Sequence, residues 1–240
     1  MKGIVLAGGL GTRMSPLTRI TNKHLLPVYD RPMIYYPVQT LIESGIKEIL
    51  IVTGGNSAGD FLKLLRNGAE FGLHHLNYAY QEGENGIAAA LSLAEDFADG
   101  GPVCVVLGDN ILQNSISAAV KKFRHQGSGA KILLSKVHDP QRFGVPVFQD
   151  GTIVRIEEKP QKPASPYAVI GVYMYDHRVF EITRRLKPSA RGELEITDVN
   201  NEYIAAGDMT WDVLEGWWTD AGTFDSLLRA SNLVAESKAD

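Results

Sequence analysis

Residues 3–13 read GIVLAGGLGTR, an apolar run that passes directly into a loop with three glycines in four positions. The run 3–7 is typical of a strand that helices cover on both faces. Gly8, Gly9 and Gly11 would let backbone N–H groups approach a polyphosphate closely, because glycine carries no side chain to hold a ligand away. The stretch therefore predicts an α/β fold whose first strand ends in a phosphate-binding loop.

Two common phosphate-binding loops do not fit this stretch. The P-loop requires Lys followed by Ser or Thr after its last glycine, and Thr12-Arg13 stand there instead. A dinucleotide fingerprint requires an acidic residue at the end of a second strand about 20 residues further on, and Asp30 lies in a proline-flanked segment without a strand pattern. What remains is a loop that places Arg13 beside phosphates, with Lys23 following as a second cation.

The remaining chain alternates between strand and helix patterns. Apolar runs predict strands at 47–53 and 102–107 and a strand-like segment at 77–80, and helical spacing predicts helices at 33–44, starting at Pro32, and at 86–98. Beyond about residue 130 the pattern predicts strands at 130–137, 144–149, 152–157 and 167–175, helices near 176–186 and 195–206, and a closing helix from Thr223. We expect a single domain over residues 1–240, a Rossmann-like three-layer α/β/α sandwich around a mixed, mainly parallel sheet.

The composition excludes several classes of protein. The 24 basic and 28 acidic residues give a net charge of -4, and without a long basic run this argues against a nucleic acid polymer as partner. Cys104 is the one cysteine, which excludes an intrachain disulfide and a thiolate zinc site, and we expect it to be buried. No apolar run approaches the roughly 20 residues that span a bilayer, so we expect a cytoplasmic protein without a membrane partner.

The loop 8–16, GGLGTRMSP, together with Lys23-x-x-x-Pro27, resembles the signature of the sugar-nucleotide pyrophosphorylases, a family of sugar nucleotidyltransferases. Further matches are PMIYYP at 32–37, LGDN at 107–110, EEKP at 157–160, RGELEITD at 191–198 and WTDAGT at 218–223. The similarity is greatest to the dTTP-dependent branch, in a short form without its C-terminal helical extension. It implies a Mg²⁺-dependent homo-oligomer that joins dTTP to glucose 1-phosphate and releases pyrophosphate, with residues 1–130 serving the nucleotide and 131–240, which include a β-rich subregion, the sugar phosphate.

The resemblance also implies the residues of the nucleotide side. Arg13 and Lys23 would be the catalytic cations, and Asp109 and Asp220 would hold the metal, as Mg²⁺ prefers one or two carboxylates plus substrate phosphates. The nucleotide contacts would be Leu6, Gly8, Gly9, Gly11, Thr12, Arg13, Lys23, Gln81, Gly86 and Asp109. Taken singly, Asp109 could instead form a turn with Asn110, and Asp220 could serve the N-terminus of the closing helix.

On the sugar-phosphate side the resemblance implies Gly144, Glu158, Lys159, Val169, Arg191 and Trp218. Glu158 would bind sugar hydroxyls, whereas Lys159 and Arg191 would bind the phosphate. Strand alternation would place Glu158 and Lys159 on opposite faces if the strand persists, and a surface ion pair among Glu157, Glu158 and Lys159 is the alternative. Trp217 and Trp218 are expected to pack on the core, with stacking on a ligand as the other option.

Two other functions remain open at this point. A uridylyltransferase would share the phosphate-binding residues, and the Gln81 amide, which both donates and accepts, does not easily distinguish thymine from uracil. An inactive sensor of nucleotide sugars could use the same scaffold. The presence of Arg13, Lys23, Asp109 and Asp220 together argues against the sensor, because a sensor does not need the metal pair.

Overall fold

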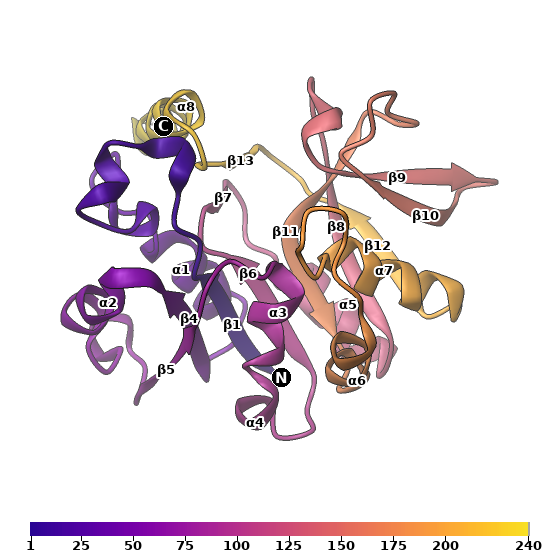
Figure 1. Cartoon of the computed structure of the whole chain (residues 1–240), viewed down its shortest axis with the longest axis horizontal. Helices are drawn as coiled ribbons and strands as arrows, with labels where there is room; N and C mark the ends of the chain where they lie inside the picture. The colour runs from indigo at the N-terminus through magenta and orange to yellow at the C-terminus, as the bar shows by residue number, and fades with distance from the viewer. Residues whose placement is uncertain (240) are drawn as a thin grey trace.

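A nine-stranded mixed sheet forms the centre of the protein in a computed structural model that describes residues 1–239 (Figure 1). Its strands are β1 (Lys2–Ala7), β4 (Ile49–Gly54), β5 (Leu76–Gln81), β6 (Val103–Leu107), β8 (Ala130–Lys136), β9 (Gly144–Gln149), β10 (Thr152–Glu158), β11 (Tyr167–Tyr175) and β12 (Met209–Val213). The order is β10-β9-β11-β6-β1-β4-β5, and β8 pairs with β11 and β12. The strands β6-β1-β4-β5 run parallel, as does the β8–β12 pair, whereas β11 pairs antiparallel with its neighbours.

Helices cover both faces of the sheet because each central strand is apolar on both sides. In β1, Ile4 and Leu6 pack against one core cluster, and Val5 and Ala7 pack against the other. The first cluster includes buried residues of α3 (Ile87–Ser92), α4 (Glu95–Ala98), α6 (Arg178–Arg185) and α7 (Ile196–Ala205). The second includes those of α1 (Tyr35–Glu43), α2 (Ala58–Leu65) and α5 (Ser117–Gln126). The three-layer α/β prediction is thus confirmed.

A third, smaller core cluster holds the end of the described chain against its beginning. Helix α8 (Phe224–Ala239) buries Ala230 and Val234 together with Val28 of the short strand β2 (Pro27–Val28). Figure 1 shows α8 beside the N-terminal loops, far from the N-terminus itself. Just before α8, β13 (Trp218–Asp220) pairs antiparallel with β7 (Asn110–Leu112), which follows β6. This pairing brings the WTDAGT segment next to the LGDN segment.

Several boundaries differ from the prediction. The predicted helix 86–98 is two helices, α3 and α4, which are separated at Leu93 and Ala94. The first predicted helix does not start at Pro32, because Pro32 lies in β3 (Arg31–Pro32) and α1 begins at Tyr35. Helices α2 and α5 and strand β12 were not predicted. Within residues 1–239, no helix is both long enough and apolar enough to cross a membrane.

Asp176 is a buried carboxylate that stabilises the fold away from the glycine-rich loop. It accepts hydrogen bonds from the Gly129 amide at 2.7 Å, the Tyr203 hydroxyl at 2.8 Å and the Arg178 guanidinium at 2.9 Å. Burial opposes its ionisation, but these donors hold the pKa of Asp176 below its ordinary value. The stabilisation is therefore complete above the unfolded pKa of about 3.9 and is lost as the pH falls through the lower native pKa.

We expect Asp176→Asn to lower the free energy of unfolding by about 1–3 kcal/mol at pH 7, because charge-assisted hydrogen bonds are lost. The difference from wild type should shrink below about pH 4, where the wild-type carboxylate also becomes protonated. Urea unfolding at pH 7 and pH 3 measures both values. Asp150→Asn, at an exposed turn, is the control. A loss of equal size at both pH values would show that the charge of Asp176 is not what stabilises the protein.

Candidate active site

A cavity of about 570 Å³ opens at the carboxyl ends of the parallel strands β1 and β6, the edge at which open α/β sheets usually bind ligands. Every residue that the sequence predicted for the site lines this one cavity. From the nucleotide side these are Leu6, Gly8, Gly9, Gly11, Thr12, Arg13, Lys23, Gln81, Gly86 and Asp109; from the sugar-phosphate side they are Gly144, Glu158, Lys159, Val169, Arg191 and Trp218; Asp220 completes the set. The two halves of the chain therefore share a single site.

The glycine-rich loop is shaped by its close approach to neighbouring side chains. A Cβ atom on Gly8 would clash with the carboxamide of Gln81, so a larger residue at this position would require that side chain to move. Gly11 has a φ of +66°, in the left-handed region that favours glycine, and its carbonyl accepts a hydrogen bond from the Thr18 hydroxyl at 2.9 Å. The short 3-10 turn Thr12–Met14 follows and carries Arg13 into the cavity.

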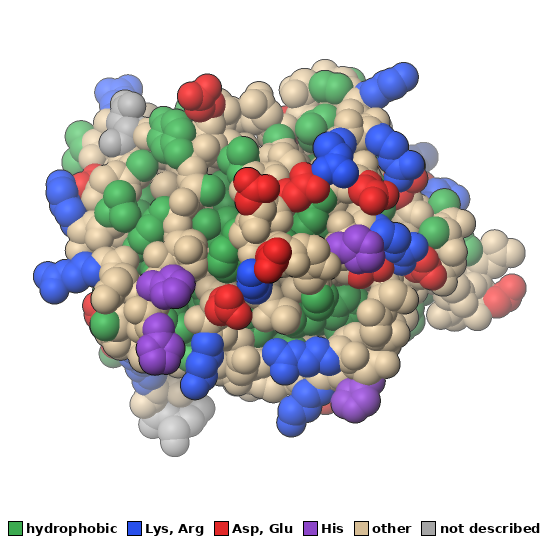
Figure 2. Space-filling model, turned by 90° about the horizontal axis from the view of Figure 1, so that it is seen from below, with side chains coloured by type: hydrophobic (Ala, Val, Ile, Leu, Met, Phe, Trp, Pro, Cys, Tyr) green, Lys and Arg blue, Asp and Glu red, His purple; other side chains and the backbone are tan. Residues whose placement is uncertain are grey.

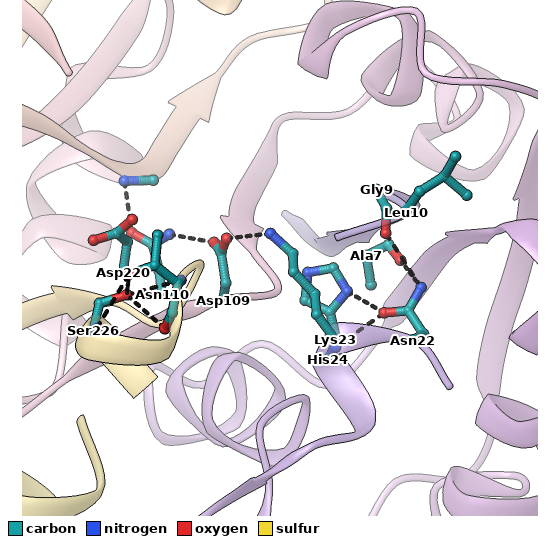
Figure 3. A network of polar contacts seen from close by, with 12 residues as sticks. Ala7, Gly9, Leu10, Asn22, Lys23, His24, Asp109, Asn110, Asp220 and Ser226 are labelled. Carbon is teal, nitrogen blue, oxygen red and sulfur yellow. Dashed lines mark hydrogen bonds and ion pairs between the residues drawn. The ribbon is translucent and has the colours of Figure 1, made fainter. Parts of the chain in front are cut away.

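Two buried residues that the sequence analysis did not select, Asn22 and His24, support this loop through hydrogen bonds. Asn22 donates from Nδ2 to the carbonyls of Ala7 and Gly9, each at 3.4 Å, and its Oδ1 accepts from the His24 amide at 2.9 Å (Figure 3). His24 Nδ1 lies 2.7 Å from the same oxygen, and since an amide oxygen only accepts, Nδ1 carries the proton. Burial, together with the neighbouring charge of Lys23, lowers the pKa of His24 to about 3, so its ring is neutral.

Lys23 and Asp109 form an ion pair at the floor of the cavity. The distance from Lys23 Nζ to Asp109 Oδ2 is 2.6 Å, and only 12% of each side chain is exposed. Asp109 Oδ1 also accepts a hydrogen bond from Asn110 at 2.9 Å, and Figure 3 shows Asp109 between these two donors. Burial opposes the charge of Asp109, but Lys23 and Asn110 hold the pKa of this carboxyl well below its usual range. Asp109 is therefore ionised.

Asp220 reaches the same place through the β13–β7 pairing, in which it lies opposite Asn110. A Cβ atom built on Gly222 would lie 3.4 Å from Asp109 Oδ2, 3.5 Å from Asp220 Oδ2 and 3.0 Å from Arg13 Nη2. Both carboxylates and the guanidinium thus approach the space beside Gly222. Burial and the charge of Asp109 raise the pKa of Asp220 to about 6, against the opposing effect of nearby cations such as Arg142.

The donor set at this point fits Mg²⁺. Asp109 and Asp220 supply two carboxylates whose mutual repulsion a divalent cation would relieve. In the described part of the chain, no group of three or more acidic, histidine or cysteine side chains is arranged to hold a metal ion. The two carboxylates would therefore need substrate phosphates as further ligands, which is the arrangement that Mg²⁺ commonly adopts.

Three of the residues predicted for the sugar-phosphate side, Gly144, Glu158 and Val169, meet where β9, β10 and β11 pair. Gly144 lies opposite Glu158 in the β9–β10 pairing and opposite Val169 in the β11–β9 pairing. Glu158 Oε2 accepts a hydrogen bond from Thr197 at 2.5 Å, and its Oε1 lies 3.5 Å from Lys159 Nζ. The expected placement of Glu158 and Lys159 on opposite faces required the strand to persist, and it does not: β10 ends at Glu158, Lys159 has a φ of +45°, and both residues line the cavity.

Arg191 is held by a residue that the sequence analysis missed. Its guanidinium lies 2.8 Å from both carboxylate oxygens of Glu195, whose side chain is buried, and 3.5 Å from Glu158 Oε1. The spacing of four residues between Arg191 and Glu195 was visible in the RGELEITD segment. Thr197, in the same segment, and Arg142, whose Nη2 lies 3.4 Å from Asp220 Oδ2, also line the cavity and were not selected.

Gly86 and Trp218 join the two halves of the site by packing. Gly86 has a φ of +95°, and a Cβ atom there would clash with the backbone of Leu194. Trp218 is buried, donates from Nε1 to Asn110 at 2.6 Å and packs edge-on against Phe143 at 5.2 Å between ring centroids. Both tryptophans pack on the core, as predicted. Trp218 is itself buried, and Trp217 packs against the third core cluster, which contains Ala230 and Val234 of α8.

On the face shown in Figure 2, basic and acidic side chains are interspersed rather than gathered by sign. Cys104 is buried in β6, as the sequence predicted.

Comparisons with known proteins agree with this geometry. A family model described as nucleotidyl transferase matches residues 2–237. The glucose-1-phosphate thymidylyltransferase of Neisseria meningitidis is 46% identical over 238 residues, covering 98% of this chain and 82% of the relative. That of Mycolicibacterium smegmatis is also 46% identical over 238 residues, with the same coverage.

Solved structures give the same picture. A crystal structure of a Bacillus anthracis protein assigned as a glucose-1-phosphate thymidylyltransferase, in complex with sucrose, superposes with a TM-score of 0.93 at 52% identity, covering 97% of this chain and 94% of that one. A UDP-glucose pyrophosphorylase in complex with UDP-glucose shares the fold, with a TM-score of 0.85, 24% identity and 98% coverage of each chain. By the extent of the family match and the identity to these relatives, the chain belongs to the nucleotidyl transferase family.

Proposed function

We propose that the protein transfers a thymidylyl group from dTTP to α-D-glucose 1-phosphate, giving dTDP-glucose and pyrophosphate. One observation carries the proposal. A single cavity holds two separate cationic groups, Arg13 with Lys23 at the glycine-rich loop and Lys159 with Arg191 at the end of β10 and beyond. Two anionic substrates that react with each other need this arrangement, and relatives at 45–46% identity carry the name of this activity.

The reaction would be a direct in-line attack of a sugar phosphate oxygen on the α-phosphorus of dTTP, with pyrophosphate as the leaving group. No protein nucleophile is needed, so the residues align two anions and stabilise the charge that develops between them. Arg13 offers a planar fork to phosphate oxygens, and Lys23 acts as a point charge held in place by Asp109. Asp109 and Asp220 would hold Mg²⁺, which neutralises phosphate charge when bound.

The remaining residues would orient the substrates. Gln81 is buried against Gly8, so its amide is fixed at the wall where a pyrimidine edge could meet it. Glu158 lines the cavity with Oε2 bonded to Thr197 and Oε1 only 3.5 Å from both Lys159 and Arg191, and these oxygens would accept from sugar hydroxyls through their remaining lone pairs. Arg191 is oriented by Glu195, which leaves its position fixed before a phosphate arrives.

UTP is the alternative nucleotide, because the amide of Gln81 pairs with thymine and uracil equally well. Turnover with dTTP and UTP, each at several concentrations with glucose 1-phosphate, tests the choice through release of pyrophosphate. We expect the higher kcat/KM with dTTP. A clear preference for UTP would make the protein a uridylyltransferase, and absence of turnover with either nucleotide would point to an inactive sensor.

Lys159→Ala is expected to weaken binding of glucose 1-phosphate by about 1.5–3 kcal/mol, because a charge-assisted contact to phosphate is lost. Binding of dTTP should barely change, since the cations proposed to hold its phosphates, Arg13 and Lys23, come from the glycine-rich loop and the segment that follows it. Calorimetry with each ligand under identical salt measures both affinities. Lys162→Ala, which removes an exposed lysine three residues away, is the control. Equal losses for both ligands, or a loss for dTTP alone, would show that Lys159 does not serve the sugar phosphate in the way proposed.

A further inference from the structure

One carboxylate in the cavity wall has no part in the assignments above. Glu84 lies in the loop between β5 and α3, and its Oε1 accepts a hydrogen bond from the backbone N–H of Leu10 at 2.7 Å. Leu10 lies between Gly9 and Gly11, which line the cavity together with Glu84, whereas Leu10 itself lines a second pocket that shares Thr12 with the cavity. The Glu84 carboxylate thus occupies the N–H of Leu10, a donor in the loop that we propose binds the nucleotide phosphates.

We infer that Glu84 competes with the nucleotide for the glycine-rich loop, so that its carboxylate sets the affinity for nucleoside triphosphates; this inference rests on the proposed function. A carboxylate oxygen and a phosphate oxygen make the same demand on an N–H group, since both are anionic acceptors. The single N–H of Leu10 cannot serve both at hydrogen-bond distance, and the two anions also repel each other. A phosphate that binds at Leu10 must displace Glu84.

The surroundings of Glu84 allow this displacement. Its side chain is exposed, and it enters none of the ion pairs within residues 1–239, so the carboxylate would move into water after breaking one hydrogen bond. Gly83, the preceding residue, has a φ of +72°, and a Cβ atom there would come no closer than 3.7 Å to another side chain. The backbone beside Glu84 therefore has space in which to rotate.

The far end of the same loop is fixed. The carbonyl of Asn85 accepts a hydrogen bond from the Leu194 amide at 2.9 Å, and Gly86 packs directly against the Leu194 backbone. Gln81, at the start of the loop, is buried against Gly8. Glu84 can therefore leave Leu10 while the residues that would contact the base keep their places. Its effect should be confined to phosphate affinity and should not change the choice of base.

The test is calorimetry of dTTP and UTP binding to the wild type and to Glu84→Gln and Glu84→Ala. Both variants should bind each nucleotide about threefold to tenfold more tightly, with alanine at least as tight as glutamine, because glutamine keeps a neutral acceptor for the Leu10 N–H. Glu82→Gln removes the same charge from an exposed position two residues away and should leave both affinities unchanged. Thermal unfolding of each variant verifies that it is folded.

Three other outcomes would overturn the inference. Weaker binding in Glu84→Ala with wild-type affinity in Glu84→Gln would mean that Glu84 holds the loop in its binding shape. Unchanged affinity in both variants would mean that no competition exists, while the proposed function would stand. Failure of the wild type to bind either nucleotide would remove the proposed function together with this inference. A preference for UTP with the expected order of variants would instead correct the function alone.

Discussion

Replacement of Arg13 by alanine is expected to lower turnover by about 10²–10³-fold, the scale seen when one preorganised charge-stabilising group is removed. Arg13 leaves the glycine-rich loop directly, and its Nη2 approaches the point between Asp109 and Asp220 that Gly222 leaves open. A guanidinium there would act on the transferring phosphoryl group, where charge builds during the reaction. The loss should therefore fall mainly on kcat and less on the KM for either substrate.

Arg19→Ala is the matched control for this prediction. Arg19 is exposed, lies six residues further along the same segment and does not line the cavity, so its loss changes the net charge equally without touching the site. Steady-state kinetics of both variants, with circular dichroism to verify the fold, provide the comparison. Turnover close to wild type in a folded Arg13→Ala protein would remove Arg13 from the catalytic role.

The second large effect is expected at the carboxylate pair. Asp109→Asn and Asp220→Asn should each lower turnover by about 10²–10³-fold at a fixed Mg²⁺ concentration and shift the Mg²⁺ titration to higher concentration, because each removes one of two proposed ligands. Direct binding of Mn²⁺, followed by its paramagnetic resonance signal in the presence of dTTP, gives a readout that does not depend on turnover. Weaker Mn²⁺ binding should accompany the loss of activity.

The two variants also differ in a way that the structure predicts. Asp109 is the partner of Lys23, so Asp109→Asn frees a buried lysine as well as removing a ligand, and it should be the less stable of the two. Asp220 lies beside another carboxylate, so Asp220→Asn relieves repulsion in the metal-free protein and should cost little stability. Asp99→Asn, at an exposed turn, is the control. If turnover of both Asp109→Asn and Asp220→Asn depended on Mg²⁺ concentration as in the wild type, the proposal that the two carboxylates share one Mg²⁺ would be wrong.

The sequence by itself determined the features that depend on neighbouring residues. The apolar run of β1, its three glycines and Arg13 follow one another along the chain, so the strand, the loop and the cation could be predicted together. Asp109 could be placed in the same way, because it comes directly after the buried strand β6. In such cases a local pattern selects the backbone, and the backbone fixes where the next side chain lies.

Only the tertiary structure decided how residues far apart in the chain pair with one another. Asp220 meets Asp109 because β13 pairs with β7, and both strands are three residues long, too short for a periodic pattern to predict. The pairing of the Leu10 amide with Glu84, which lie 74 residues apart, likewise depends on how the loop after β5 packs against the glycine-rich loop. Such contacts carry no sequence period, because the packing of the finished fold selects one carboxylate among many. The sequence therefore predicted residues that line one cavity, and the fold determined which of them hold one another in place.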